Sequence, residues 1–422
     1  MTHVTRPAPA CYHDFMNFRV TTALACIIWL VACSTEDSPA TDPSQEIRSP
    51  AVEASSLPRL TSGPGDSAWL SWVESSQDGL SKLRLARYDQ GRWAGSRTIA
   101  EGTQWFVNWA DFPSVIVTGD GRMLAHWLVK SASAPYAYDV VMALSNDGGD
   151  NWGQSFSPHD DGTPTEHGFV SLYDLGADFG AVWLDGRNMQ ANTTDVSGHG
   201  HGGMTLRSAR ISADGRVSAG KEVDGLTCDC CQTGAAVTDT GPVVVYRDRS
   251  EDEIRDIYIV SYRQGEWTAP RRVAGDDWRI AACPVNGPVV EAAGSRVVVA
   301  WFTDIGGPVI RAAFSEDAGD TFSEPVEISR DRPLGRTDLA LLEDGSAIVS
   351  WLAGSADGGE IRYRRITGSG TLGRSMMLAR TSDARSSGFP QMVVADGSLI
   401  FAWTDVGPPS NIRSARVGIP GD

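Results

Sequence analysis

The run Val298-Val299-Ala300-Trp301 is short, apolar and closed by a tryptophan, and similar runs return at intervals of 50 to 63 residues along the chain. A continuous apolar run of this length is typical of a strand that is covered on both faces. Around most copies the order is the same: an apolar run, a turn, the aromatic-ended run, a loop, an alternating stretch such as Val309 to Ser315, and another turn. The aromatic residues that end these runs are Trp72, Trp127, Trp183, Tyr246, Trp301, Trp351 and Trp403.

Each repeat has the size of one propeller blade, because four short strands with their turns occupy about 50 residues. The repeat continues from about Leu57 to Val417 without a long amphipathic helical pattern, which favours one ring-shaped body. The sequence therefore predicts an all-β fold, a β-propeller of four-stranded blades, with seven blades favoured and six as the alternative. The seventh copy runs out before its fourth strand, and we expect the segment from Ile47 to Ser55 to supply that strand and close the ring.

The first 33 residues have the features of a secretory signal. The apolar segment from Val20 to Ala32 is too short to span a bilayer as a permanent helix. It ends in Leu-Val-Ala-Cys33, which resembles the lipobox of bacterial lipoproteins and implies lipidation of Cys33. By the same resemblance, Ser34 after the cysteine favours the outer membrane. A plain cleaved signal and an uncleaved anchor are the alternatives.

Composition divides the rest of the chain and limits its partners. Residues 34–56 are rich in Ser, Thr, Pro and acidic residues, which predicts a disordered acidic tether, and residues 57–422 are predicted to form the propeller. The formal net charge of −17 repels nucleic acid and anionic lipid head groups, so neither is an expected partner. We expect a monomer in the cell envelope, held by its lipid anchor, whose partner is a glycan or an envelope protein.

A turn motif occurs twice inside the repeat. Ser145 to Trp152 reads S-N-D-G-G-D-N-W and Ser315 to Phe322 reads S-E-D-A-G-D-T-F. Both resemble the Asp-box, or BNR repeat, of the sialidase-like superfamily. The aspartate can accept backbone N–H groups of a tight turn, the glycine can take a left-handed conformation and the aromatic ring can pack into the sheet, so the motif predicts a structural role. Degenerate copies lie at Asp89–Trp93, Ser212–Val217 and Gln264–Trp267, each in the turn expected between the third and fourth strands.

The loops opposite the Asp-boxes are the expected functional face. In a propeller, the loops that enter first strands and those between second and third strands emerge together, and the long insertions of this chain fall there. Resemblance to sialidases implies an exo-glycosidase for acidic sugars, which needs clustered arginines, an activated tyrosine nucleophile and an aspartic acid as proton donor. The candidates are Arg187, Arg247, Arg336, Asp185, Asp248, Asp304 and Tyr246.

The sequence also departs from the sialidase pattern. The Phe-Arg-Ile-Pro motif of many bacterial sialidases is absent, and its nearest counterpart is Leu57-Pro58-Arg59-Leu60. Loop arginines beside aspartates are also typical of solvated ion pairs. A propeller that binds an envelope protein without catalysis is therefore an alternative function.

Cysteine provides the other candidate site. Alignment of the fourth and fifth repeats places Cys231 and Cys283 at nearly equivalent positions, which predicts an interblade disulfide, with Cys228 and Cys230 paired or free. The alternative is a periplasmic Cu(I) or Zn(II) site, because the C-x-C-C cysteines Cys228, Cys230 and Cys231 gather soft thiolate ligands, which Cys283 of the next repeat joins. In that alternative, two histidines of the adjacent glycine-rich loop complete the ligand set, His199 and His201.

Overall fold

The computed structural model describes residues 40–41, 44–189 and 202–421. Contacts within the chain separate Met1–Ser38 from Pro39–Asp422, and every described residue belongs to the second unit. The signal segment and Cys33 therefore lie outside the described residues. Among those residues, no helix is long and apolar enough to cross a membrane.

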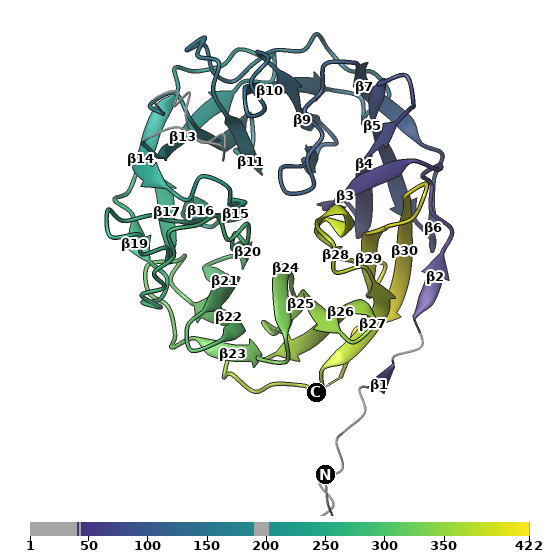
Figure 1. Ribbon diagram of the computed structural model, residues 1–422, viewed down its shortest axis with the longest axis vertical. Helices are drawn as coiled ribbons and strands as arrows, with labels where there is room; N and C mark the ends of the chain where they lie inside the picture. Colours follow the sequence, from purple (N-terminus) through teal and green to yellow (C-terminus); the bar gives the residue numbers. More distant parts are fainter. Residues whose placement is uncertain (1–39, 42–43, 190–201, 422) are drawn as a thin grey trace, which may run out of the picture. The chain divides into compact units, whose positions relative to one another are not determined.

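Seven sheets, almost entirely antiparallel, follow one another around an axis (Figure 1). Blade 1 contains β3 (Ser55–Gly63), β4 (Ser67–Ser75), β5 (Ser81–Asp89), β6 (Arg92–Trp93) and β7 (Arg97–Gly102). Blade 2 contains β8 (Ser114–Val117), β9 (Met123–Lys130) and β10 (Tyr138–Ser145). Blade 3 contains β11 (His167–Asp174), β12 (Phe179–Asp185), β13 (Met204–Ile211) and β14 (Lys221–Thr227). Blade 4 contains β15 (Gly234–Thr238), β16 (Gly241–Arg247), β17 (Ile257–Arg263), β18 (Glu266–Trp267) and β19 (Arg271–Arg272).

The remaining three blades follow the same order. Blade 5 contains β20 (Val289–Ala293), β21 (Arg296–Asp304), β22 (Pro308–Ser315) and β23 (Val326–Ser329). Blade 6 contains β24 (Pro333–Leu341), β25 (Ala347–Ser355), β26 (Gly358–Ile366) and β27 (Met376–Thr381), with β1 (Ala40–Thr41) added in parallel to β27. Blade 7 contains β28 (Gln391–Ala395), β29 (Ser398–Asp405), β30 (Asn411–Gly418) and β2 (Gln45–Ile47), and a short 3-10 turn, η1 (Arg385–Ser387), precedes it. The prediction of seven mostly four-stranded blades is confirmed.

The hydrophobic core is divided among the blade interfaces. The described residues form seven buried clusters, and each joins one blade to the next. The cluster that contains Trp72 and Ile400, for example, joins blade 1 to blade 7. Because both faces of every sheet are covered in this way, the second strands can be apolar throughout, as the sequence indicates.

Every repeat aromatic lies in the second strand of its blade and is buried. In five blades it stands directly opposite an arginine of the third strand. Three of the indole N–H groups donate to carboxylates, as Trp183 does to Asp185 at 2.8 Å and Trp301 does to Asp276 at 2.7 Å. The repeated tryptophan is therefore a core residue in every blade that has one, and in three blades it is also a buried donor to a carboxylate.

The ring closes through the segment before blade 1. Strand β2 pairs with β30, and Ile47 is buried in the interface between blades 7 and 1. A strand from the N-terminal side of the propeller does complete blade 7, as expected, but it is Gln45–Ile47 rather than the predicted segment from Ile47 to Ser55. Strand β3 already begins at Ser55, because that part of the chain forms the inner strand of blade 1.

Both Asp-boxes form the turn after the third strand, as predicted. In the first, Asp147 Oδ1 accepts Ser145 Oγ at 2.8 Å and the backbone N–H of Asn151 at 2.9 Å. Gly149 has a φ of 83°, the left-handed conformation that the tight turn requires. The side-chain hydrogen bond from Asn151 lowers the pKa of Asp147 to about 2. The second box repeats these contacts around Asp317. The structural role of the motif is thereby explained.

Candidate functional site

The predicted arginines do not converge on one site. Arg247 is 1% exposed, and its guanidinium donates to three backbone carbonyls, those of Arg255, Asn286 and Phe302, at 2.6 to 3.0 Å. It also lies 4.9 Å from the ring of Trp278. Burial lowers the pKa of Arg247 to about 9. This side chain joins blades 4 and 5 and has no free edge for a ligand.

Arg336 is used in a similar way at the start of blade 6. Its guanidinium donates to Ser387 Oγ at 2.6 Å and to the carbonyls of Ala384 and Gly388 at 3.1 Å. The ring of Trp109 lies 5.1 Å from its Cζ atom. Burial lowers the pKa of Arg336 to about 10. Arg336 therefore holds the loop that enters blade 7.

Arg187 lies in a network of charges at the edge of blade 3. It forms a bidentate pair with Asp185 at 2.7 Å for each bond and reaches Asp161 at 3.0 Å. Burial opposes ionisation of Asp185, but the hydrogen bonds from Arg187 and the charge of His167 outweigh it and lower the pKa of Asp185. His167 Nε2 lies 3.1 Å from Asp161, and the ring of His159 stacks on that of His167 at 4.0 Å.

Two groups within this network could hold a metal ion. The donor atoms of Asp139, His159 and His167 lie within 4.8 Å of one another, as do those of Asp161, His167 and Asp185. Both groups already have internal partners. His159 Nε2 accepts the backbone N–H of Val140 at 3.2 Å, and the cationic position between Asp161 and Asp185 is filled by Arg187. A metal would have to displace these contacts.

The other predicted catalytic residues are scattered. Tyr246 is 1% exposed and donates its hydroxyl hydrogen to Asp224, and burial raises its pKa, so it is not an activated nucleophile. Asp248 follows it, and burial raises the pKa of Asp248 to about 7. Asp304 is exposed at the end of β21 in blade 5. The structure places Asp304 in a different blade from the Tyr246–Asp248 pair.

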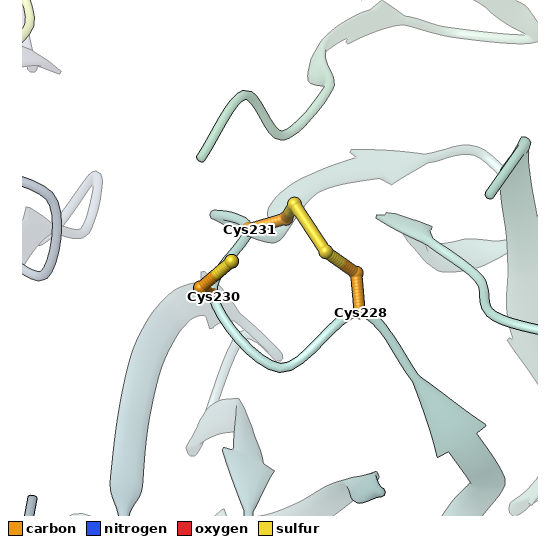
Figure 2. A group of neighbouring side chains, drawn as sticks. All are labelled: Cys228, Cys230 and Cys231. Atoms are coloured by element: carbon orange, nitrogen blue, oxygen red, sulfur yellow. A yellow bond between two sulfur atoms is a disulfide. The ribbon is translucent and has the colours of Figure 1, made fainter. Parts of the chain in front are cut away.

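The four cysteines of the propeller form two disulfides, Cys228–Cys231 and Cys230–Cys283. Figure 2 shows the first of them within the tight C-x-C-C turn that enters blade 4. An interblade bridge to Cys283 is present, but the predicted partner Cys231 is wrong. Cys231 instead reaches back to Cys228, where the Cα atoms are 5.8 Å apart, and this leaves Cys230 for Cys283.

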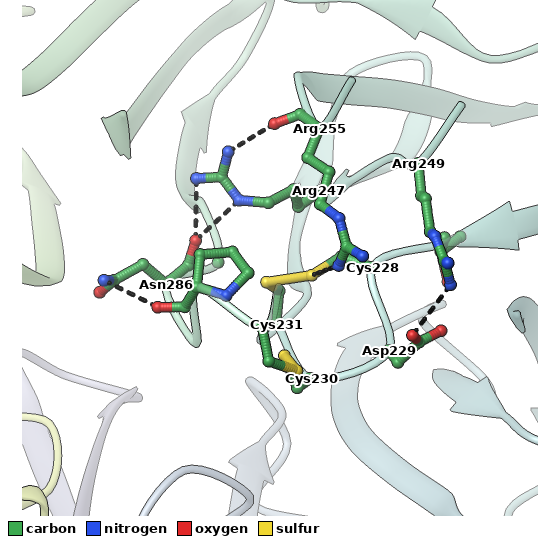
Figure 3. The surroundings of a disulfide bond; sticks show 12 residues. Cys228, Asp229, Cys230, Cys231, Arg247, Arg249, Arg255 and Asn286 are labelled. Carbon is green, nitrogen blue, oxygen red and sulfur yellow. Dashed lines mark hydrogen bonds and ion pairs between the residues drawn. A yellow bond between two sulfur atoms is a disulfide. The ribbon is translucent and has the colours of Figure 1, made fainter. Parts of the chain in front are cut away.

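The sulfur atoms of Cys228, Cys230 and Cys231 lie within 4.8 Å of one another, so the group could hold a metal if it were reduced. Arg255 donates to Cys228 Sγ at 3.3 Å (Figure 3). The two histidines proposed as further ligands, His199 and His201, lie outside the described residues.

The inner strands of the ring enclose a cavity of about 330 Å³. Arg59 of β3 lies in its wall and donates to Gln391 Oε1 at 2.6 Å. Asp338 of β24 and Glu291 of β20 line the same cavity. Arg59 belongs to Leu57-Pro58-Arg59-Leu60, the segment whose sequence is most similar to the absent sialidase motif. That similarity was the one signal in the sequence that could have identified Arg59 as a site residue. The two carboxyl groups could not be recognised, because they lie inside strands that resemble the others.

In this cavity, here called the axial cavity, the charges of Arg59, Asp338 and Glu291 influence one another's ionisation. Burial raises the pKa of Asp338 to about 6, although Arg59 and the backbone N–H groups of Met392 and Leu339 oppose the shift. Glu291 is open to the cavity but enclosed by the ring, and this enclosure together with the charge of Asp338 raises its pKa. The cavity thus combines a permanent cation with two carboxyl groups that can exchange protons near neutral pH.

One loop lines the cavity beside the inner strands. Residues 107–113, here called the axial loop, connect blade 1 to blade 2 and contact blades 3 and 4 and the loop that enters blade 7. Gln232 of the cysteine-containing loop donates to Ala110 O at 2.6 Å, and Trp109 stacks on Phe389 at 6.0 Å. Asp111 accepts the backbone N–H of Phe169 at 2.8 Å. The axial loop therefore forms part of the cavity wall.

A buried acidic pair anchors the axial loop. The hydroxyl group of Tyr138 lies 2.8 Å from Asp111 Oδ2 and 2.7 Å from Glu166 Oε1. The phenol has one hydrogen and cannot donate it fully to both oxygens, so one carboxyl group must carry a proton. Burial raises the pKa of Asp111 and that of Glu166, which agrees with a shared proton.

No protein-family model matches the sequence. No curated protein sequence matches it either. Similar solved structures exist at low identity. An ulvan lyase of polysaccharide lyase family PL25, bound to GlcA(1-4)Rha3S, has a TM-score of 0.56 and 10% identity, covering 89% of this chain and 96% of the lyase. A protein of unknown function from Dyadobacter fermentans has a TM-score of 0.50 and 14% identity, covering 91% of this chain and 99% of the other.

The NanB sialidase from Streptococcus pneumoniae scores 0.45 with 9% identity, covering 84% of this chain and 83% of the sialidase. The likeness to the ulvan lyase and to the Dyadobacter protein concerns the propeller fold alone, and the chemistry has to be argued from the site itself.

Proposed function

We propose that this protein is a glycan-directed propeller that takes an acidic sugar residue into the axial cavity. The observation that supports the proposal is the placement of Arg59, Asp338 and Glu291 on three inner strands around one cavity of about 330 Å³. A guanidinium group with one hydrogen bond to Gln391 still has donors for a sugar carboxylate, and such pairs can be bidentate. The acidic sugar of the ulvan lyase complex belongs to the ligand class that this arrangement suits.

The two carboxyl groups supply the proton chemistry. With a pKa of about 6, Asp338 is partly protonated near neutral pH and can donate a proton to a glycosidic oxygen or accept one from a sugar hydroxyl. Among the described residues that line the cavity there is no tyrosine. Hydrolysis through a tyrosine nucleophile is therefore less well supported than binding or cleavage by acid–base catalysis.

The test combines binding with product release. Glucuronate and N-acetylneuraminate are titrated calorimetrically, and the protein is incubated with a 4-methylumbelliferyl sialoside and with uronate-containing polysaccharides. Arg59→Met should abolish binding of the free acids. Arg216→Met is the matched control, because the Arg216 side chain is 83% exposed in a turn on the Asp-box face. Equal binding by wild type and Arg59→Met would refute the proposal.

A second candidate function is favoured by the sulfur atoms. We infer that the reduced C-x-C-C turn can bind Cu(I) or Zn(II) through Cys228, Cys230 and Cys231, whose sulfur atoms are within 4.8 Å of one another. Protein reduced under anaerobic conditions is titrated with either metal alongside the triple serine variant. Stoichiometric binding by wild type alone supports the metal site, and equal weak binding by both proteins removes it.

The place of the protein in the cell is proposed from the sequence alone. The lipobox-like segment before Cys33 and the following Ser34 support lipidation and retention at the outer membrane. Metabolic labelling with a fatty acid should label the wild-type chain but not Cys33→Ser. Fractionation of the two proteins would then show whether the lipid determines their membrane association.

A further inference from the structure

The two disulfides differ in their access to solvent. Cys228 is 0%, Cys231 is 1% and Cys230 is 8% exposed. Cys283 is exposed. Among the described cysteines, a thiolate arriving from solvent can therefore reach Cys283 first. Attack on a disulfide requires approach to one of its two sulfur atoms, so this difference decides which bond reacts.

The outer disulfide, Cys230–Cys283, lies beside the wall of the axial cavity. Two residues after Cys230, Gln232 accepts the backbone N–H of Gly287 at 3.1 Å and donates to Ala110 of the axial loop at 2.6 Å. The two loops touch so closely that a Cβ atom on Gly287 would lie 1.9 Å from the backbone oxygen of Gln232. Gln232 thus connects the outer disulfide to the axial loop through two hydrogen bonds.

We propose that Cys230–Cys283 is a thiol-exchange site, attacked at Cys283 by a dithiol reductant, and that its opening loosens the axial loop over the cavity. The incoming thiolate forms a bond to Cys283 Sγ and breaks the Cys230–Cys283 bond, and the electron pair and then a proton go to Cys230 Sγ. The second thiol of the reductant attacks its own sulfur in the mixed disulfide and releases Cys283. The reductant leaves as a disulfide, so two electrons have been transferred.

The inner disulfide provides the contrast. Both sulfurs of Cys228–Cys231 are buried, and Cys228 also accepts a hydrogen bond from Arg255. Figure 3 shows Arg255 donating to Cys228, while Arg247 points to Asn286 and Arg249 to Asp229. The inner disulfide keeps the C-x-C-C turn closed while the outer one reacts. It is therefore the natural control for the outer disulfide.

The chemical part of the proposal is tested on the folded full chain. The protein is treated with increasing dithiothreitol, alkylated with iodoacetamide and analysed by peptide mass spectrometry. Label should appear on Cys230 and Cys283 before it appears on Cys228 and Cys231. In a parallel reaction with glutathione, the mixed disulfide should form on Cys283. Simultaneous labelling of all four cysteines, or a glutathione adduct on the inner pair, would overturn the proposal.

The structural part is tested by hydrogen exchange. Oxidised wild type is compared with Cys230→Ser/Cys283→Ser and with Cys228→Ser/Cys231→Ser. In Cys230→Ser/Cys283→Ser, the Gly287 amide and the amides of the axial loop should exchange about tenfold faster than in wild type. Exchange in strands that are remote from this disulfide should be unchanged. Wild type in which only the outer bond has been reduced should behave in the same way, which keeps the test valid if the variant does not fold. Unchanged exchange in the reduced protein, or an equal gain in the inner variant, would contradict the proposal.

Discussion

Arg247, at the end of the second strand of blade 4, and Arg59, in the inner strand of blade 1, differ in the groups that their guanidinium donors contact. The guanidinium of Arg247 is enclosed by three carbonyl oxygens and an indole ring. That of Arg59 is half-buried, donates to Gln391 and faces a cavity with two carboxyl groups. The first arginine is a structural fastening between blades, and the second has donors for a ligand. The identity of a residue does not decide this difference, which depends on the acceptors within reach.

The largest expected effect is on stability. Arg247→Met leaves the carbonyl groups of Arg255, Asn286 and Phe302 buried without their donor, so the free energy of unfolding should fall by about 3–5 kcal/mol. Urea denaturation followed by tryptophan fluorescence measures it. Arg413→Met is the control, because Arg413 is 39% exposed in a surface ion pair with Glu46. A loss below about 1 kcal/mol would show that the buried contacts of Arg247 are not a fastening.

The charge network of blade 3 should give an intermediate effect. Asp185→Asn keeps an acceptor for Trp183 but removes the charge that neutralises Arg187, so we expect a loss of about 1–3 kcal/mol. Urea denaturation applies here as well, with the exposed Asp214→Asn as control. If Asp185→Asn were as stable as wild type, the network would have to be regarded as adaptable, and a metal site there would become easier to accept.

Arg59→Met should affect ligand binding more than stability, the opposite of what is expected for Arg247→Met. Because Arg59 makes one hydrogen bond, to the buried Gln391, its loss should lower the free energy of unfolding by about 1–2 kcal/mol, which is less than the loss expected for Arg247→Met. Binding of glucuronate or N-acetylneuraminate, measured by calorimetry, should nevertheless disappear. A strongly destabilised variant that still binds the acids would reverse the roles assigned to the two arginines.

The smallest effect concerns pH. Asp338 has a pKa raised to about 6, so it loses its negative charge as the pH falls through that value and the cavity becomes more positive. Affinity for an anionic sugar should therefore increase by about twofold to tenfold between about pH 7 and pH 5. Asp338→Asn should bind with the higher affinity at both pH values. A wild-type affinity that falls with decreasing pH would show that the ionised carboxylate takes part in binding.

Asp338 should also contribute more to the stability of the folded protein at acidic pH than at neutral pH. Its folded pKa lies above its ordinary value of 3.8, so the folded state favours the protonated carboxyl group. This contribution is fully present below about pH 4 and is lost as the pH rises through about 6. The stability difference between wild type and Asp338→Asn should therefore widen in favour of the asparagine variant from acidic to neutral pH.

Much of the fold could be predicted because it is repeated. The aromatic-ended second strands and the Asp-box turns depend on neighbours a few residues away, as the contacts of Asp147 with Ser145 and Asn151 show. Seven copies of such a pattern favoured seven blades over six, and the structure has seven. The position of the closing strand was less accurate, because Gln45–Ile47 carries no local signal apart from Ile47.

The candidate site depended on contacts that the chain makes over long distances. Arg59 meets Gln391 across 332 residues, and the choice of Cys230 rather than Cys231 for Cys283 depends on how one loop turns toward the next. The sequence by itself determined the repeat, its turns and the buried aromatic of each blade, because these follow from local hydrogen bonding and from hydrophobic periodicity. Only the tertiary structure decided which arginine faces the cavity and which cysteines pair, since both depend on the partners that ring closure brings together.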